Sequence, residues 1–432
     1  MRVVGLGVWV FLHLVFLGMS AYLYLLWVQY WRYVDANTYQ PLTTNYTAAS
    51  RALHYKVREI EVRAGKPRFY ARRQDPPQPP PPPPPRPSYT PTPTPNITTT
   101  TPISRDNLLK AIERHKMDVM VRLRKAQMQE GNILFKQQEN KYGVAYKGPR
   151  IRGNPTREQL MCAFRHSSFR SLRDGDEPFT SQGLAKHFPS SGLLEGRYFN
   201  TCAVVSNAGS MKGSKMGNFI DSHDAVIRFN HAPTEGFEED VGTRTTLRII
   251  NSQVVTKPNF DFWGSPLYSG VALLVWDPCK YNASLDEWYR SPDFDFFPVY
   301  FRRRLMLPQE DMHLLHPASL WRVWDVLQSH TNTHVLPNPP SSGFLGIILM
   351  MAHCETLSVV EYVPSLRQTN KCHYWNKYEN PVCTFGGWHP LATEKLLSLV
   401  LNEASDEETF SEGFIRIPGF RSLTCPSLHP GT

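Results

Sequence analysis

The sequence has no cysteine pair at the spacing that zinc sites use. It contains 432 residues and seven cysteines, of which none precedes residue 150 and no two form a C-x-x-C pair. Structural zinc sites are usually assembled from such pairs, so the pattern argues against a zinc site. Three disulfides and one odd thiol in an oxidising compartment are the simpler interpretation.

The common nucleotide-binding fingerprints are also missing. There is no G-x-G-x-x-G and no P-loop lysine spacing, which argues against NAD and ATP and nearly excludes a Rossmann oxidoreductase. The formal net charge of +9 suggests acidic partners. However, the basic residues come without a nucleic-acid-binding motif, so we predict no nucleic-acid partner.

A long apolar run lies near the N-terminus. Residues 3–28 are almost wholly apolar, and only His13 and Ser20 interrupt them. A run of about 20 apolar residues spans the hydrocarbon core of a bilayer, whereas the apolar part of a cleaved signal peptide usually has about 7–15 residues. We therefore expect an uncleaved signal-anchor at 3–28 behind a cytoplasmic tail of residues 1–2, with a cleaved signal peptide as the alternative.

The segment after the apolar run has no credible core. Residues 76–87 are nearly pure proline, which favours an extended spacer, and residues 88–102 form a Thr-Pro tract typical of O-glycosylated stalks. We expect a disordered lumenal stem at 29–140, Pro/Thr-rich at 76–102. Within it, residues 106–140 have a helical pattern that would suit packing on the next domain.

N-glycosylation sequons support a lumenal orientation. They begin at Asn45, Asn96 and Asn282, and an acceptor asparagine is useful only in the lumen.

The composition becomes globular from about residue 141. Five short apolar runs predict buried strands at Ala203–Ser206, Ala225–Phe229, Thr246–Ile250, Val271–Trp276 and Leu357–Tyr362. Helical patterns lie between or after them at Trp321–Gln328, Gly343–His353 and Leu391–Asn402. Because strands alternate with helices, we predict an α/β domain at 141–432 with a mostly parallel sheet.

Asparagines follow three of these predicted strands. Asn207 opens a glycine-bearing loop after the first strand, and Asn230 and Asn251 each follow a later one. Ligands gather at the carboxyl ends of parallel strands, and an amide can both donate to and accept from a phosphate, ribose or carboxylate. Each position alone fits a generic α/β turn equally well.

Two further segments have residues suited to chemistry. Ser341, Ser342 and Gly343 precede an apolar helix, where hydroxyls and free N–H groups suit an anion, although a simple helix cap fits the same residues. Farther along, Pro390 fits the first turn of a helix and puts His389 at its entrance. A histidine there can act as a general base, although a lone histidine is more often structural.

Four segments together resemble the motifs of animal sialyltransferases, in family order. Residues 202–253, which contain Cys-Ala-Val-Val-Ser-Asn-Ala-Gly, resemble the large sialylmotif, and residues 339–361 resemble the small one. Residues 372–383, and His389 with Glu394, resemble the two shorter motifs that follow. The likeness covers nearly everything after about residue 140, and the β-galactoside α-2,6-sialyltransferases fit best. It implies a Rossmann-like sheet flanked by helices, the sialyltransferase variant of the GT-A type.

The resemblance also implies roles for individual residues. The donor would be CMP-sialic acid, and its site would be formed by Asn207, Asn230, Asn251, Ser341, Ser342, Gly343, His373, Thr384 and Lys395. His389 falls on the catalytic base, which takes the proton from the galactose 6-hydroxyl so that the anomeric configuration inverts. The acceptor positions would be Gln253, Asp293 and Trp388. The cysteines would pair as Cys162–Cys425, Cys202–Cys354 and Cys372–Cys383, leaving Cys279 free.

Some residues depart from the family pattern. Asn207 stands where Ser is expected, His373 where Tyr is expected, and Trp388 replaces a Tyr beside the base, which puts acceptor preference in question. Asp293-Phe-Asp295 matches the D-x-D pattern of metal-dependent glycosyltransferases. Neutral donors and a helix N-terminus can stabilise a leaving group with a single phosphate, so we interpret Asp293 as an acceptor contact and expect no metal and no cofactor.

These observations predict an inverting, metal-independent α-2,6-sialyltransferase that acts on galactose-terminated glycoprotein glycans. It would be a single-pass type II protein of the Golgi membrane with a lumenal catalytic domain. A sialyltransferase with a GalNAc or LacdiNAc acceptor is one alternative, and a catalytically silent glycan-binding surface protein is a more remote one. Release of a soluble form by stem cleavage stays open, and the sequence does not reveal the oligomeric state.

Overall fold

The computed structural model describes residues 16, 18–20, 22, 24, 104–133, 140–151, 153–167, 169–421 and 423–426. The chain divides into two compact units, Met1–Thr94 and Pro95–Thr432, and every element named below belongs to the second. Among the described residues, no helix is both long enough and apolar enough to cross a membrane. Apart from six helical positions, the predicted anchor at 3–28 lies outside the described residues, as do residues 29–103 with Asn45 and Asn96.

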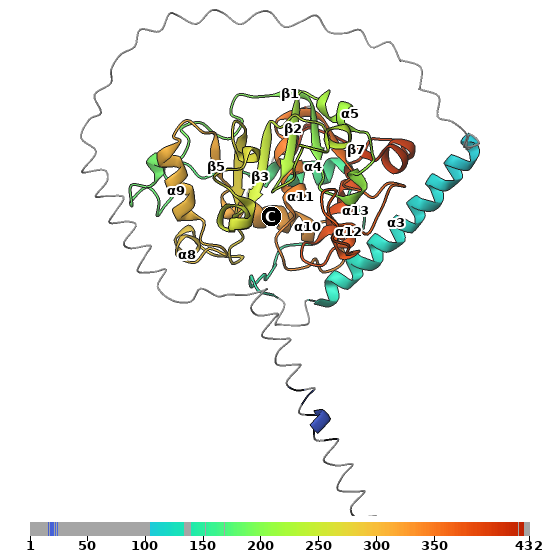
Figure 1. The fold of residues 1–432 in the computed structure, drawn as a ribbon, viewed down its shortest axis with the longest axis horizontal. Coiled ribbons are helices and arrows are strands. Elements are labelled where there is room, and N and C mark those ends of the chain that lie inside the picture. Colours follow the sequence, from blue (N-terminus) through green and yellow to red (C-terminus); the bar gives the residue numbers. More distant parts are fainter. Residues whose placement is uncertain are drawn as a thin grey trace, which may run out of the picture. The chain divides into compact units, whose positions relative to one another are not determined.

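A seven-stranded sheet organises the second unit (Figure 1). Its strands, in chain order, are β1 (Phe199–Val205), β2 (Ala225–Phe229), β3 (Leu247–Asn251), β4 (Ala272–Trp276), β5 (Met312–Leu314), β6 (Cys354–Val360) and β7 (Phe414–Pro418). They lie in the order β5-β4-β3-β2-β1-β6-β7, and every pair is parallel except the antiparallel pair of β6 and β7. The chain therefore winds outward from β1 to β5 and returns to place β6 on the other side of β1. In sheets of this kind, the reversal point beside β1 is where ligands bind.

Helices connect and cover the strands. The α-helices are α3 (Arg105–Ile133), α4 (Arg157–His166), α5 (Gly217–Asp221), α6 (Glu238–Val241), α7 (Ser252–Thr256), α8 (Leu285–Arg290), α9 (Phe297–Met306), α10 (Pro317–Ser329), α11 (Ser342–Met351), α12 (Val382–Phe385) and α13 (Leu391–Leu401). Single turns of other helix types are η2 (Ala185–His187), η3 (Gly209–Met211), η4 (Pro258–Phe260), η5 (Pro266–Tyr268) and the π-helical η6 (Glu408–Glu412).

Two apolar clusters lie on opposite faces of the sheet, because successive strand residues point to opposite sides. The larger cluster includes Val204 and Ile227 and is covered by α11, while the smaller one includes Val205 and Val226 and is covered by α5 and α6. Helix α11 lies very close to the sheet, since a Cβ added at Gly346 would stand 2.7 Å from a ring carbon of Phe229. This close packing fixes the position of the N-terminus of α11 relative to the strand ends.

The sequence pattern found the central strands and missed the two edges. The predicted strand Ala225–Phe229 matches β2 at both ends, and the other four predicted strands overlap β1, β3, β4 and β6. The pattern missed β5, which has only three residues, and β7, whose five residues include both Arg416 and Pro418. The three predicted helices are confirmed as α10, α11 and α13.

Part of the predicted stem is a long helix. Helix α3 packs against α12 and α13, as Figure 1 shows, and buries Ile112, Val119 and Leu123. The helix expected from the pattern of residues 106–140 is therefore present and packs as anticipated. The boundary at residue 141 between stem and catalytic domain stays a prediction.

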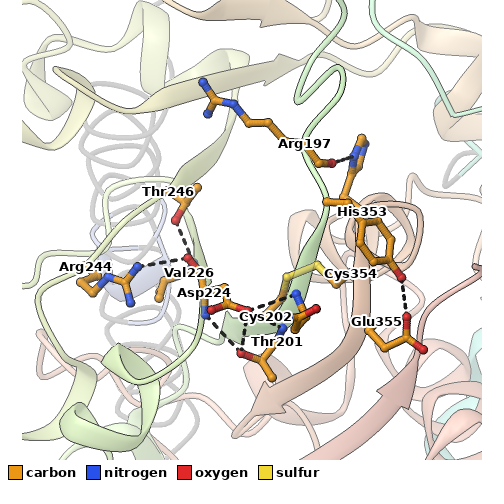
Figure 2. The surroundings of a disulfide bond; sticks show 12 residues. Arg197, Thr201, Cys202, Asp224, Val226, Arg244, Thr246, His353, Cys354 and Glu355 are labelled. Atoms are coloured by element: carbon orange, nitrogen blue, oxygen red, sulfur yellow. Dashed lines mark hydrogen bonds between the residues drawn. A yellow bond between two sulfur atoms is a disulfide. The ribbon is translucent and has the colours of Figure 1, made fainter. Parts of the chain in front are cut away.

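Three disulfides tie the fold together. They join Cys162 to Cys425, Cys202 to Cys354 and Cys372 to Cys383, which are the pairs that the family resemblance implies. The second joins the middle of β1 to the first residue of β6, on the side of the sheet away from the carboxyl edge, and Figure 2 shows its surroundings. The remaining thiol, Cys279, is free and buried.

Candidate active site

Three asparagines gather at the carboxyl edge of the sheet. Asn207, Asn230 and Asn251 stand at the ends of β1, β2 and β3, and Asn230 Oδ1 accepts a hydrogen bond from the backbone N of Asn251 at 3.0 Å. Asn207 Nδ2 donates to the carbonyl of Phe229 at 3.4 Å. The buried Asn207 Oδ1 has no protein partner among the described residues. An orphaned acceptor at a ligand-binding edge suits a donor group on a bound molecule.

The backbone of Asn230 is held in an unusual conformation. Its φ of 50° lies in the left-handed region, which asparagine tolerates better than most residues. Behind it, the buried Arg248 of β3 donates to the carbonyls of Asn230 at 2.9 Å and Ala232 at 3.1 Å. The arginine thus fixes the loop that presents Asn230. Burial lowers the pKa of Arg248 to about 10, so it stays cationic at neutral pH.

The N-terminus of α11 faces the same edge. Ser341 is its N-cap and accepts a hydrogen bond from the backbone N of Phe344 at 3.1 Å, while Ser342 Oγ accepts from Trp276 Nε1 at 2.9 Å. The first N–H groups of an α-helix lack partners within it and favour an anion. Gly343, in this first turn, has no side chain to cover them. The two sequence readings, cap and anion site, are therefore compatible.

A buried glutamate connects this helix to α13. Glu394 is fully buried and accepts hydrogen bonds from Ser341 N at 2.7 Å, Ser341 Oγ at 2.6 Å and the Tyr362 hydroxyl at 2.6 Å. Burial raises the pKa of this carboxyl, against the opposing effect of its hydrogen bonds. Glu394 therefore fixes the N-terminus of α11 from behind.

The next residue, Lys395, reaches the segment closed by the third disulfide. Its Nζ donates to the carbonyl of Thr384 at 2.5 Å, and burial lowers its pKa to about 8. A cavity of about 40 Å³, lined among others by Ser210, Thr384 and Lys395, separates this segment from the loop after β1.

His389 lies directly before α13, with Pro390 as the helix N-cap rather than in the first turn as predicted. Its Nδ1 is 2.8 Å from the carbonyl oxygen of Pro339, in the loop that leads into α11. A carbonyl only accepts, so Nδ1 carries the proton and Nε2 keeps its lone pair. Burial lowers the pKa of His389 to about 4, so the imidazole is neutral near neutral pH. A neutral imidazole with a free Nε2 lone pair can accept a proton, although the lowered pKa makes His389 a weaker base than an ordinary histidine in this structure.

The predicted acceptor residues lie in three separate segments. Trp388 is 44% exposed and packs edge-on against His389 with ring centroids 4.5 Å apart. Asp293 forms an ion pair with Lys141 and lies 3.4 Å from the Tyr142 hydroxyl, while Gln253 Oε1 accepts from Lys257. An acceptor contact by Asp293 would therefore compete with Lys141.

His373 stands apart from the asparagine cluster. Its ring stacks on Trp375, with centroids 4.5 Å apart, and Nδ1 bonds Asn376 Nδ2 at 2.9 Å. The backbone of the next residue, Tyr374, donates to the carbonyl of Asn207 at 3.3 Å and so joins this segment to the loop after β1. No side-chain contact between His373 and the asparagines is present among the described residues.

Sequence reasoning missed several residues that support the site. Buried examples are Arg248, Asp277, Glu361 and Tyr362, and each lies in a strand or within two residues of its end. Asp277 follows β4 just as Asn230 follows β2, so the strand-end pattern could have found it. Glu361 follows β6 and accepts from Ser210 Oγ at 2.7 Å and Ser365 Oγ at 2.8 Å. In the described part of the chain, no three His, Cys, Asp or Glu side chains are grouped so that they could hold a metal ion.

Comparison with known proteins identifies the family. The profile of Glycosyltransferase family 29 (sialyltransferase) matches residues 179–405, which include all but a few of the residues described above. The chain belongs to this sialyltransferase family. The matched region runs from before β1 into the segment after α13 and thus contains the whole carboxyl edge of the sheet.

The relatives of this family-29 chain include named enzymes. It is 45% identical over 290 residues to Beta-galactoside alpha-2,6-sialyltransferase 2 of Xenopus tropicalis, a match that covers 66% of this chain and 56% of that protein. The protein of the same name in Homo sapiens is 44% identical over 294 residues, covering 67% and 55%. The match thus spans little more than half the length of these relatives. A solved mammalian sialyltransferase is 23% identical with a TM-score of 0.35, covering 59% of this chain and 85% of that one.

Proposed function

We propose that this protein transfers sialic acid from CMP-sialic acid to the 6-hydroxyl of terminal galactose on glycoprotein glycans. Membership of the sialyltransferase family and 45% identity to a β-galactoside α-2,6-sialyltransferase support the reaction and the linkage. The observation that carries the mechanism is the bond of His389 Nδ1 to the Pro339 carbonyl, which leaves Nε2 free to accept a proton. The His389 ring lies near the N-terminus of α11, because its centroid is 6.4 Å from that of Trp276, which donates to Ser342.

In the proposed reaction, His389 Nε2 takes the proton of the galactose 6-hydroxyl. The oxygen then attacks the anomeric carbon of sialic acid while the bond from that carbon to the CMP phosphate breaks, and CMP leaves with the electron pair. Attack from the side opposite the leaving group inverts the configuration. The first N–H groups of α11 and the side-chain N–H groups of Asn230 would stabilise the phosphate charge, while Asn207 Oδ1 would accept a hydrogen bond from a donor group of CMP-sialic acid.

The remaining donor and acceptor assignments are part of the same proposal. Asn251, Ser341, Ser342, Gly343, His373, Thr384 and Lys395 would complete the donor site, and Gln253, Asp293 and Trp388 would contact the sugar acceptor. No metal takes part in this scheme. Three disulfides and the exposed position of Asn282 support a lumenal catalytic domain, and we place the protein in the Golgi membrane as a single-pass type II protein.

The exposed Trp388 beside the base favours testing a second acceptor class. The full chain in detergent should release CMP when given CMP-sialic acid and N-acetyllactosamine, and the product should lose its sialic acid only to an α-2,6-cleaving sialidase. Faster turnover on GalNAc or LacdiNAc termini would support the alternative acceptor. Absence of both donor hydrolysis and transfer would leave the glycan-binding alternative.

A further inference from the structure

A buried carboxylate lies beneath the proposed acceptor side of the site. Asp277 follows β4 directly and is 1% exposed. It accepts four hydrogen bonds, from Ser252 Oγ, Trp288 Nε1 at 3.0 Å, Asp293 N at 2.9 Å and Phe294 N at 3.3 Å. Every group that donates to it in the described part of the chain is neutral.

The four donors come from three separate parts of the chain. Ser252 stands between Asn251 and Gln253 at the start of α7, Trp288 belongs to α8, and the other two donors are backbone groups at positions 293 and 294. Asp277 therefore fixes the backbone of Asp293, whose own carboxylate points toward Lys141 and Tyr142. It also ties that backbone to Ser252, which follows Asn251 at the start of α7.

Burying the Asp277 carboxylate is energetically unfavourable. A buried charge without a cation is unfavourable unless hydrogen bonds satisfy it. Burial, the first cause, and the nearby Asp293 both act to raise its pKa, to about 6, and the ionised group also faces Tyr142 and the Cys279 thiol. An apolar side chain could fill this place in the core, but it could not hold two backbone N–H groups at the proposed acceptor site.

We propose that Asp277 is a positioning residue that sets where the Asp293 carboxylate meets the acceptor sugar and couples this position to the start of α7. The inference rests on the proposed function and adds a specificity-determining residue to it. Each carboxylate oxygen of Asp277 accepts two hydrogen bonds. Oδ1 accepts from Ser252 and Phe294, and Oδ2 accepts from Trp288 and Asp293. An amide in this place has one accepting oxygen. In either orientation, Asp277→Asn therefore loses the hydrogen bond from one of the two backbone groups, Asp293 N or Phe294 N.

The test uses the full chain in detergent and compares wild type with D277N. We expect the KM for N-acetyllactosamine to rise tenfold or more, while the KM for CMP-sialic acid changes less than threefold. Asp295→Asn serves as the matched control, since Asp295 is an exposed carboxylate in the same loop, and should leave both KM values unchanged. Unchanged melting temperatures identify variants that keep the fold.

A double-mutant comparison separates positioning from a merely structural role. In an Asp293→Ala background, D277N should raise the acceptor KM less than twofold further, because the side chain that it positions is already gone. An additional tenfold rise in that background would overturn the inference, as would equal effects on both KM values in the single variant.

If D277N does not fold, a second variant tests the same inference. Ser252→Ala removes one hydrogen bond to Asp277 and should raise the acceptor KM about threefold with the donor KM unchanged, whereas an unchanged acceptor KM would overturn the inference. If wild type itself forms no sialylated product, the proposed function fails. If wild type is active and both variants behave like it, the inference alone fails.

Discussion

Replacing His389 tests the chemical step most sharply. Asparagine is the informative replacement, because its amide can still donate to the Pro339 carbonyl, which accepts from His389 Nδ1 at 2.8 Å. What it cannot supply is the basic Nε2. The groups proposed to hold the donor phosphate, at the N-terminus of α11 and at the strand ends, stay in place.

The expected loss is that of a general base. Such a base contributes about 10²- to 10⁴-fold to the rate, or roughly 3–5 kcal/mol of barrier. His389→Asn should therefore lower kcat by that factor while the affinity for CMP changes less than about threefold. The assay is CMP release under saturating donor and acceptor, with CMP binding measured by calorimetry. His334→Asn, at an exposed histidine in the segment that also contains Pro339, is the matched control.

Two results would refute this account of His389. If His389→Asn keeps more than a tenth of the wild-type turnover, the residue is not the base. If turnover and CMP affinity fall together, the histidine acts by holding the loop at Pro339 rather than by accepting a proton.

Three other predictions follow from the buried groups and the proposed mechanism. Glu394→Ala leaves the Ser341 and Tyr362 donors unpaired, so the free energy of unfolding, measured by denaturant titration, should be about 3 kcal/mol lower than that of wild type. An unchanged denaturation midpoint would contradict this. Because burial raises the pKa of Asp277 to about 6, the contribution of Asp277 to the free energy of unfolding should decline as pH rises from about 4 to 6. The acceptor KM should rise as pH falls through 6, because protonated Asp277 accepts fewer hydrogen bonds. D277N should abolish both trends, and a KM profile identical to wild type would count against the assignment. EDTA should leave turnover unchanged, and restoration by Mn²⁺ of activity lost to EDTA would instead make Asp293 a metal ligand.

The centre of the fold could be predicted because its strands are buried on both faces. Runs such as Ala272–Trp276 read as continuous apolar segments, which is the signature of a covered parallel sheet. The edges gave weaker signals: β5 is too short for a period, and the five residues of β7 include both Arg416 and Pro418. The strand order, which creates the reversal point beside β1, has no local signature in the sequence.

The site could be predicted only in part, since strand ends and helix starts are visible in a sequence but long-range contacts are not. Asn207, Asn230 and Asn251 were found from their places after strands. The bond from His389 to Pro339 spans 50 positions, and the bonds from Glu394 to Ser341 span 53. Such contacts depend on how α11 and α13 pack, and local pattern does not encode that.

The most direct test of the central claim is the linkage of the product. Full-length protein, incubated with CMP-sialic acid and N-acetyllactosamine without added metal, should yield one sialylated trisaccharide whose NMR spectrum shows substitution at the galactose 6-position with α configuration. Sialic acid at the galactose 3-position, or no transfer while CMP still binds, would contradict the account.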